Sequence, residues 1–338
     1  MYLTFYNLKR EPFSLSPDHN FLYLSEVHKE GLAHLRYCLI RQRGFVLITG
    51  EVGTGKTTLI HALLAQVPQK VKTVFISNPS LKRDEFFELL AHGFGLGVVG
   101  NKGQFIIKFT QFLEEAQKRG EHVLLIIDEA HCLSPDILEE IRLLSNLETP
   151  NVKLISIILV GQPEFKEIIE NPKNRALRQR ISLFFSLRPL SRQETADYIR
   201  FRLMKAGAKD LAIFSETALD SIFLFSQGVP RLINKLADHA LLTGFVKEVK
   251  YIDDKIIKEC AKEAGIVPSD SSNDRPHVAV KKGRIFSSKL VAKFFVAFSI
   301  VATISSFLLW YFVLDPEEKR QIMDLCNKII FQGKLWGK

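Results

Sequence analysis

The chain has few cysteines, and none of them is paired by its spacing. Its 338 residues include four, which lie far apart: Cys38, Cys132, Cys260 and Cys326. Structural zinc sites and haem attachment sites use cysteine and histidine at short, regular spacing. The pattern excludes such sites and a disulfide-stabilised secreted domain, so we expect four reduced thiols.

The N-terminus lacks the features of a signal peptide. It reads MYLTFYNLKREPF, in which no basic start is followed by an apolar core. The chain also lacks the composition of a disordered protein, because 46% of its residues are hydrophobic and 26 are Phe. We therefore expect no cleavable leader, and a folded chain with room for two packed units and an appendage.

Acidic residues are outnumbered by basic ones, 37 to 46, which gives a formal net charge of +9. A basic surplus favours anionic partners such as nucleic acid, nucleotides or lipid head groups. Much of this surplus lies just before an apolar segment near the C-terminus. We therefore assign it to the flank of a membrane anchor in contact with lipid, in preference to a nucleic-acid interface.

Five short apolar runs predict the strands of a parallel sheet. Near-continuous apolar strands are typical of a sheet covered by helices on both faces, and these runs occupy 45–50, 73–77, 122–128, 154–161 and 181–187. Helical segments fall between them. The sequence therefore predicts an α/β fold of three layers over residues 45–188, preceded by a lead-in segment of the same domain, 1–44, with a helix near 26–43.

The region 189–265 contains no comparable strand. Pro189 and the sequence Gly228–Val229–Pro230 punctuate four predicted helices, at 191–206, 215–227, 230–247 and 253–264. We interpret this region as a small all-helical lid. A linker rich in Ser, Asp, Asn, Pro and Lys follows at 266–292.

Residues 294–314 form a run of 21 residues without a charge. At about 1.5 Å per residue, a helix of that length spans about 30 Å of hydrocarbon. The run predicts one transmembrane helix, followed by a short amphipathic tail over 315–338. The alternative is a buried hydrophobic helix of a soluble protein.

The sequence GEVGTGKT matches G-x-x-x-x-G-K-[ST] between an apolar run and a helix-forming segment, the context of a P-loop. Its glycines let backbone N–H groups turn toward phosphates at a helix N-terminus. Lys56 is expected to reach the β- and γ-phosphates of ATP, and Thr57 to ligate Mg²⁺. The alternative is a chance glycine turn. The predicted nucleotide-binding residues here are Gly50, Glu51, Val52, Gly53, Thr54, Gly55, Lys56, Thr57 and Thr58.

The run VLLIIDEAH (123–131) ends an apolar strand in two acids, as a Walker B element does. Asp128 is expected to hold Mg²⁺ through a water, and Glu129 to orient and deprotonate the attacking water. The alternative is a strand end capped by two solvated acids. His131 is placed near the γ-phosphate or, as the plainer interpretation, in a structural or surface role.

Four further residues are candidates for catalysis or sensing. Gln162, after the strand LISIILVG, would lie between the two motifs above and position the water, unless it is only a turn residue before Pro163. Arg178 or Arg180, in NRALRQRI, would reach the γ-phosphate held by a neighbouring subunit, unless they belong to a surface basic helix. Arg231, in GVPRLINKL, would distinguish ATP from ADP, unless it is a surface charge.

These segments together resemble one family, the general secretion pathway protein A (ExeA-type) ATPases, over residues 1 to about 265. The resemblance rests on MYLTFYNLKREPFSLSPDHNFLYLSEVHKEGLAHLRYCL, GEVGTGKTT, LLIIDEAHCLSPDILEEIRLLSNLET, LVGQPEF, ALRQRI and GVPRLINKL. It implies a P-loop NTPase core of the AAA+ kind with a helical lid. It also implies that Gln162 is sensor 1, Arg178 or Arg180 the arginine finger and Arg231 sensor 2.

Members of that family work in the cell envelope, where they help an outer-membrane secretion or pilus machine assemble. Many carry a periplasmic peptidoglycan-binding domain after the membrane helix, whereas 24 residues follow the apolar run here, so we expect a variant without it. Relatives associated with exopolysaccharide export fit as well as type II secretion. A homo-oligomer and an inner-membrane partner protein are the expected associations.

Two other functions compete with an envelope ATPase. A DNA-binding ATPase of the transposition-helper type would share the AAA+ core and the basic charge, but it has no need of the uncharged run 294–314. A sensor that binds ATP and hardly hydrolyses it would not need Glu129.

We predict that residues 294–314 cross the inner membrane once, with the ATPase in the cytoplasm and the tail in the periplasm. Lys and Arg near a span favour its cytoplasmic side, and the N-side flank holds Lys281, Lys282, Arg284, Lys289 and Lys293, whereas the C-side begins Asp315–Pro316–Glu317–Glu318 before Lys319 and Arg320. Alkaline phosphatase fused after residue 338 should be active, and fused at residue 270 inactive. The reverse pattern, or release of the protein by high-salt washing, would overturn the anchor.

Overall fold

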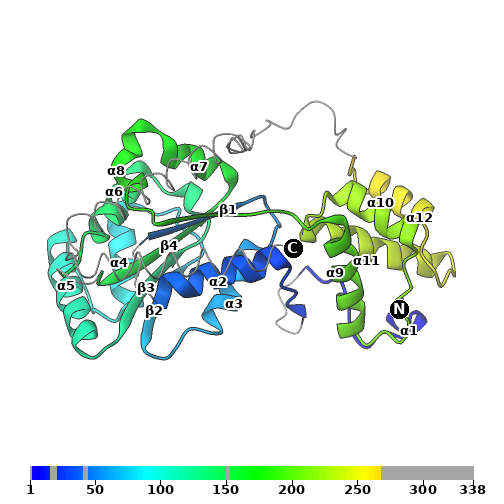
Figure 1. Cartoon of the computed structure of the whole chain (residues 1–338), viewed down its shortest axis with the longest axis horizontal. Helices are drawn as coiled ribbons and strands as arrows, with labels where there is room; N and C mark the ends of the chain where they lie inside the picture. Colours follow the sequence, from blue (N-terminus) through cyan, green and yellow to red (C-terminus); the bar gives the residue numbers. More distant parts are fainter. Residues whose placement is uncertain (1, 16–20, 41–44, 150–152, 268–338) are drawn as a thin grey trace, which may run out of the picture. The chain divides into compact units, whose positions relative to one another are not determined.

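The computed structural model describes residues 2–15, 21–40, 45–149 and 153–267. Five strands in this part form one parallel sheet in the order β2-β3-β4-β1-β5 (Figure 1). They are β1 (Phe45–Gly50), β2 (Val71–Ile76), β3 (His122–Ile127), β4 (Ile155–Gly161) and β5 (Leu183–Leu187). The predicted α/β fold is confirmed, and each strand ends within two residues of the predicted position.

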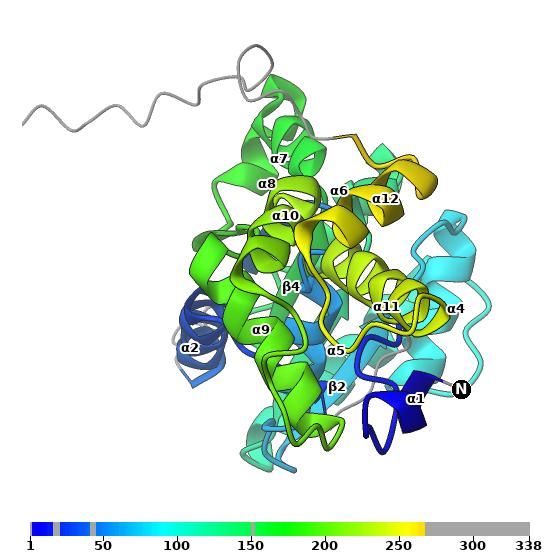
Figure 2. The same ribbon diagram turned by 90° about the vertical axis from the view of Figure 1, so that its right-hand side faces the viewer.

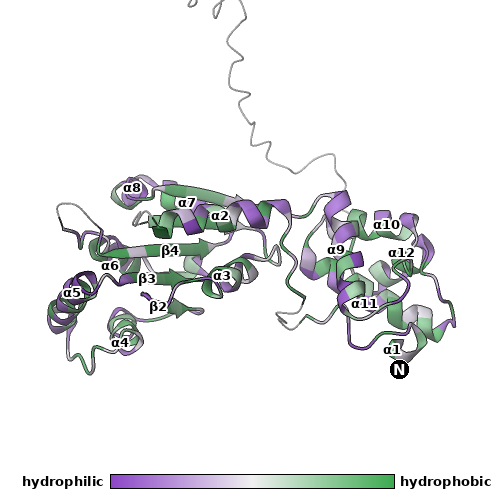
Figure 3. Ribbon diagram, turned by 60° about the horizontal axis from the view of Figure 1, so that its bottom comes forward, coloured by the Kyte–Doolittle hydropathy of each residue, from purple (hydrophilic) through white to green (hydrophobic). Residues whose placement is uncertain are grey.

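Successive side chains of the central strands enter two different cores. In β1, Phe45 and Leu47 belong to one core and Val46 and Ile48 to the other. Successive side chains of a strand point to opposite faces, so both faces of the sheet are buried. Figure 3 accordingly shows β3 and β4 in the hydrophobic colour along most of their length.

Helices cover each face of the sheet. Helices α2 (Glu26–Ile40) and α3 (Lys56–Leu64) supply Leu32, Leu35, Leu59 and Ile60 to one core. The other core receives large aromatic side chains, chiefly Phe86, Phe105, Phe109 and Phe165, which explains part of the high Phe content. The helices on that face are α4 (Arg83–Gly93), α5 (Lys102–Lys118), α6 (Pro135–Leu144) and α7 (Pro163–Glu170).

Four helices after β5 surround a third core. Figure 2 shows them grouped together: α9 (Arg192–Lys205), α10 (Glu216–Ser226), α11 (Pro230–Val246) and α12 (Asp254–Glu263). Three of these helices begin after an N-cap residue whose side chain accepts a hydrogen bond from a backbone N–H group. These N-cap residues are Ser191, Ser215 and Asp253.

The first residues of the chain pack into this helical core. Helix α1 (Tyr2–Phe5) begins a segment whose Phe13 is 1% exposed and belongs to the helical core. The Tyr2 hydroxyl donates a hydrogen bond of 2.7 Å to Asp238 in α11, and Arg202 in α9 donates to the Pro12 carbonyl. Of the lead-in segment assigned to the ATPase domain, α2 packs on the sheet, whereas residues 2–13 pack on the helices.

No helix in the described ranges, which end at residue 267, is long and apolar enough to cross a membrane. The chain divides into the units Met1–Ser269 and Asp270–Lys338. The predicted membrane span 294–314 and the tail 315–338 lie outside the described residues.

We predict that Phe13→Ala destabilises the helical group by about 3–5 kcal/mol, the usual cost of deleting a buried aromatic ring. Leu15→Ala is the matched control, because Leu15 is 59% exposed and its loss should cost less than about 0.5 kcal/mol. Denaturant unfolding of both variants checks this. Equal stabilities would contradict the packing of the N-terminal segment described above.

Candidate nucleotide-binding and catalytic site

The predicted P-loop follows the C-terminal end of β1 and leads directly into α3. Two of its glycines adopt left-handed backbone conformations, Gly53 with φ of 82° and Gly55 with φ of 101°, which a side chain would disfavour. Lys56 is the first residue of α3. The loop therefore ends at a helix N-terminus, where backbone N–H groups and the helix dipole favour an anion.

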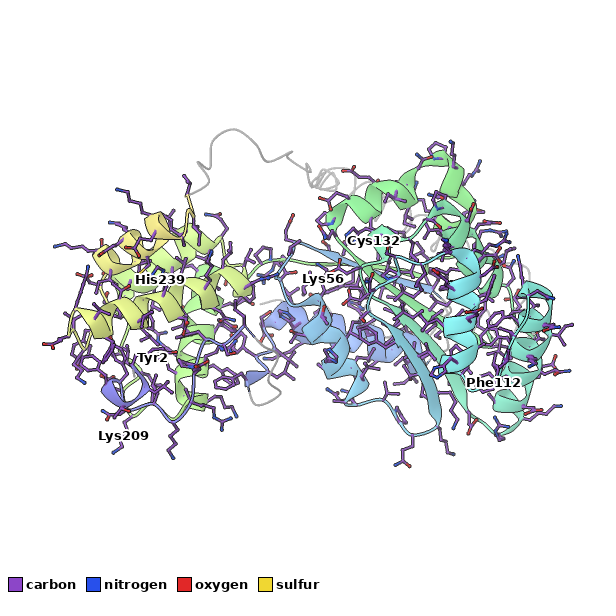
Figure 4. The ribbon with its side chains drawn as sticks, turned by 180° about the vertical axis from the view of Figure 1, so that it is seen from behind. Tyr2, Lys56, Phe112, Cys132, Lys209 and His239 are labelled. Carbon is purple, nitrogen blue, oxygen red and sulfur yellow. The ribbon has the colours of Figure 1, made fainter. Side chains whose placement is uncertain are left out.

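The Lys56 side chain is held against the loop. It is 6% exposed, and its ammonium group donates hydrogen bonds of 2.8 Å to the Gly50 carbonyl and 3.1 Å to the Glu51 carbonyl. Burial lowers the pKa of Lys56, and the carboxylates of Glu129 and Asp128 oppose that shift. Figure 4 labels Lys56, and also Cys132, which lies in the segment after β3. A partly desolvated cation at this place is suited to a phosphate.

A hydrogen bond joins the P-loop helix to the acidic pair, which consists of Asp128 and Glu129. The Thr57 hydroxyl donates to Asp128 Oδ2 at 2.7 Å, and Asp128 is 3% exposed. A hydroxyl and a carboxylate oxygen are hard ligands of the kind that Mg²⁺ prefers. The residues that the sequence predicted as metal ligands are thus adjacent, and their chemistry fits the ion.

Glu129 projects from an unusual backbone position. Its φ is 50°, a left-handed conformation that is uncommon for a residue with a side chain and concentrates at functional sites. Its side chain is 44% exposed and lies with Oε2 3.3 Å from His131 Nδ1. The carboxylate is accessible and lies beside an imidazole.

His131 also contacts Gln162, at 3.0 Å between Gln162 Nε2 and His131 Nε2. The strand order places β4 between β1 and β3, so Gln162 follows the strand between the two motifs, as the sequence predicted. Glu129, His131 and Gln162 form one connected group, which the sequence did not anticipate for His131.

Arg231 begins α11 close to the P-loop. Its backbone N–H donates to the Gly53 carbonyl at 3.4 Å, and a Cβ atom on Gly53 would lie 2.7 Å from the Arg231 Cβ. Only glycine fits this close approach. The start of α11 therefore contacts the P-loop, and the Arg231 side chain is exposed there.

Arg178 and Arg180 lie at the other end of the sheet. Arg178 ends the short helix α8 (Arg175–Arg178), seen in Figure 1 beside the sheet. Ser182 then donates from its N–H (2.9 Å) and hydroxyl (2.7 Å) to the carbonyl of Phe45, the first residue of β1. Since a strand rises about 3.3 Å per residue, the first and last residues of β1 are about 16 Å apart. The structure therefore does not bring these arginines to the P-loop of their own chain.

His28 is a contact of the P-loop that the sequence analysis missed. Its Nε2 lies 3.2 Å from the Thr54 carbonyl and its Nδ1 lies 2.7 Å from the Ser25 hydroxyl. The only signal in the sequence was a polar residue one helical turn before Leu32, on the apolar face of α2.

Comparison with known proteins agrees with this fold. Residues 40–169 match the family described as AAA domain. General secretion pathway protein A of Aeromonas hydrophila is 41% identical to the chain over 249 residues, which is 73% of this chain and 45% of that protein. The chain thus spans less than half the length of this relative.

Solved structures with the same fold are more distant in sequence. Cdc6p from Pyrobaculum aerophilum superimposes with a TM-score of 0.56 at 18% identity, covering 73% of this chain and 71% of that one. The Aeropyrum pernix ORC2 protein gives a TM-score of 0.55 at 15% identity, covering 73% and 72%. At these identities the likeness shows the fold alone.

The parallel sheet, the P-loop sequence at the end of β1 and the match of residues 40–169 define a P-loop domain of the AAA class. Within that class, the chain is a homologue of general secretion pathway protein A. The resemblance inferred from the motifs is therefore confirmed.

Proposed function

We propose that this chain hydrolyses ATP and that the reaction drives the assembly or operation of a cell-envelope machine. The observation that carries the catalytic part is the 2.7 Å bond between Thr57 and Asp128, which unites the P-loop with the acidic pair. In this proposal residues 45–188 are the ATPase core and residues 189–265 the lid. The named relative supports a role in secretion.

The chain's own residues supply most of the chemistry in this proposal. Backbone N–H groups of the P-loop and the Lys56 ammonium group bind and orient the phosphates of ATP. Glu129 accepts a proton from the attacking water while the water oxygen forms its bond to the γ-phosphorus. The bond from the γ-phosphorus to the β–γ bridging oxygen breaks, and that oxygen leaves on ADP. Thr57 and Asp128 would hold Mg²⁺, which would neutralise phosphate charge when bound.

His131 and Gln162 orient the water-activating group. The contacts from Glu129 to His131 and from His131 to Gln162 restrict the carboxylate and connect it to the end of β4. Gln162 is proposed to position the attacking water, and Arg231 to report on the nucleotide from the start of α11. These roles depend on both strands ending at the same edge of the sheet.

The proposed active form is a homo-oligomer. Since Arg178 and Arg180 lie at the end of the sheet away from their own P-loop, an arginine finger from this segment acts on the nucleotide of a neighbouring subunit. The further proposed associations are an inner-membrane partner protein of the secretion or envelope-assembly system and the membrane lipid around residues 294–314. The ATPase then works at the cytoplasmic face of the inner membrane.

We predict that Glu129→Gln lowers kcat for ATP hydrolysis by about 10²-fold or more, because the general base is lost, and leaves ATP affinity nearly unchanged. Glu170→Gln, an exposed position at the end of α7, is the control and should hydrolyse ATP at the wild-type rate. Steady-state phosphate release and nucleotide titration measure the two quantities. A wild-type rate for Glu129→Gln would assign the base to another residue.

We predict that mixing two inactive variants restores hydrolysis. Lys56→Ala removes the phosphate-binding cation, and the double variant Arg178→Ala with Arg180→Ala removes the finger. A mixed oligomer contains interfaces where an intact P-loop meets an intact finger, so phosphate release should reappear and should rise faster than linearly with protein concentration. Strict linearity without rescue would indicate that each subunit is complete by itself.

A further inference from the structure

A buried imidazole contacts the outer side of the P-loop. His28 lies in the first turn of α2 and is 3% exposed. None of its hydrogen bonds described above joins it to Asp128, Glu129 or Gln162. Its contacts instead reach the peptide at the centre of the loop, between Thr54 and Gly55.

The hydrogen bonds of His28 define which ring nitrogen donates. The Thr54 carbonyl can only accept, so the 3.2 Å contact requires that Nε2 carries the proton. In the neutral ring Nδ1 is then an acceptor, and the Ser25 hydroxyl donates to it at 2.7 Å. Burial lowers the pKa of His28, which favours this neutral form.

Two charged side chains influence the ring from the segment around the start of α9. Glu194 favours the protonated imidazole and Arg188 opposes it, and these two residues are paired with each other at 2.9 Å. Their effects on His28 therefore offset one another in part. The neutral ring with both nitrogens bonded satisfies the polar groups at this position.

The bond to Thr54 also determines the direction of the next N–H group. In a trans peptide the C=O and the N–H of one plane point in opposite directions, and every peptide bond in the described ranges is trans. When His28 holds the Thr54 carbonyl on the outer side, the Gly55 N–H points away from His28. That N–H belongs to the group of donors that a P-loop directs at phosphates.

Close packing holds the His28 ring against the P-loop. A Cβ on Gly55 would lie 2.6 Å from His28 Nε2, so the imidazole occupies the space that the glycine leaves. One turn further along α2, a Cβ on Gly31 would lie 2.6 Å from the Phe185 ring of β5. Helix α2 is therefore fixed against the sheet on the same face that carries His28.

We propose that His28 is a positioning residue for nucleotide binding: its neutral imidazole holds the Thr54–Gly55 peptide so that the Gly55 N–H faces the bound phosphates. The inference rests on the nucleotide site proposed above. His28 acts through the loop and does not itself touch the nucleotide. Its effect belongs to binding in both ground state and transition state, so it raises affinity and changes kcat little.

Three substitutions separate this role from simple packing. In His28→Gln the amide nitrogen replaces Nε2 and still donates to Thr54. In His28→Asn the shorter amide reaches only the place of Nδ1, and in His28→Leu no donor remains. His92→Leu, at an exposed position on α4, controls for the loss of a histidine.

The experiment measures the dissociation constant for Mg²⁺–ADP, the KM and kcat for ATP, and the thermal unfolding temperature of the full chain. We expect His28→Leu and His28→Asn to weaken ADP binding about tenfold, the equivalent of one hydrogen bond. KM should rise in parallel, with kcat within about threefold. We expect His28→Gln to bind within about threefold of wild type, and His92→Leu to match wild type.

Each outcome decides a separate question. If wild type itself binds no ADP, the proposed nucleotide site fails. If wild type binds and His28→Asn binds equally well, or His28→Gln binds as weakly as His28→Asn, the positioning role is overturned. If His28→Leu does not fold, the comparison of the Gln and Asn variants still distinguishes donation to Thr54 from filling of space.

Discussion

The hydrogen bond between Thr57 and Asp128 is the contact on which the candidate site depends. The two residues are 71 positions apart in the sequence. Only a parallel arrangement of β1 and β3 brings the residues that follow the two strands to the same end of the sheet. The buried apolar side chains of the strands fix that arrangement, because a shift of register by one residue would move each of them into the opposite core. The hydrophobic layers thus determine the distances between the polar groups.

The parallel direction of the strands also divides the other candidate site residues into two sets. Lys56, Glu129 and Gln162 each follow the C-terminal end of a strand and meet at one edge. Arg178 precedes β5 and lies near the other edge, where Ser182 bonds to the first residue of β1. Strand direction alone therefore distinguishes candidate residues that lie together near the P-loop of their own chain from those that lie away from it.

The sequence was most informative where local chemistry and burial act over short distances. The strands were predicted from continuous apolar runs, because both faces of the sheet are buried. The helices after β5 were predicted from the lack of such runs and from the breaks at Pro189 and at Gly228–Val229–Pro230. The P-loop and the acidic pair were recognisable because their residues are adjacent in sequence. The Thr57–Asp128 contact brings together the two residues that were predicted as ligands of one ion.

What escaped prediction depends on contacts between distant segments. His28 was overlooked because its partner Thr54 lies in another element, and no pattern within α2 identifies that partner. The contact between His131 and Gln162 requires the order of β3 and β4 in the sheet. The packing of residues 2–13 could not be read locally either, since Tyr2 and Asp238 are separated by 236 positions.

That last separation has a consequence for biosynthesis. The first residues leave the ribosome long before α11 and α12 exist, and at about 5–20 residues per second more than ten seconds pass before their partners are made. During that time apolar side chains such as Tyr6 and Phe13 have no helical core to enter. The helical group therefore completes its folding last, after the sheet, and a chain interrupted before α11 would keep an exposed aromatic segment at its N-terminus for chaperones to bind.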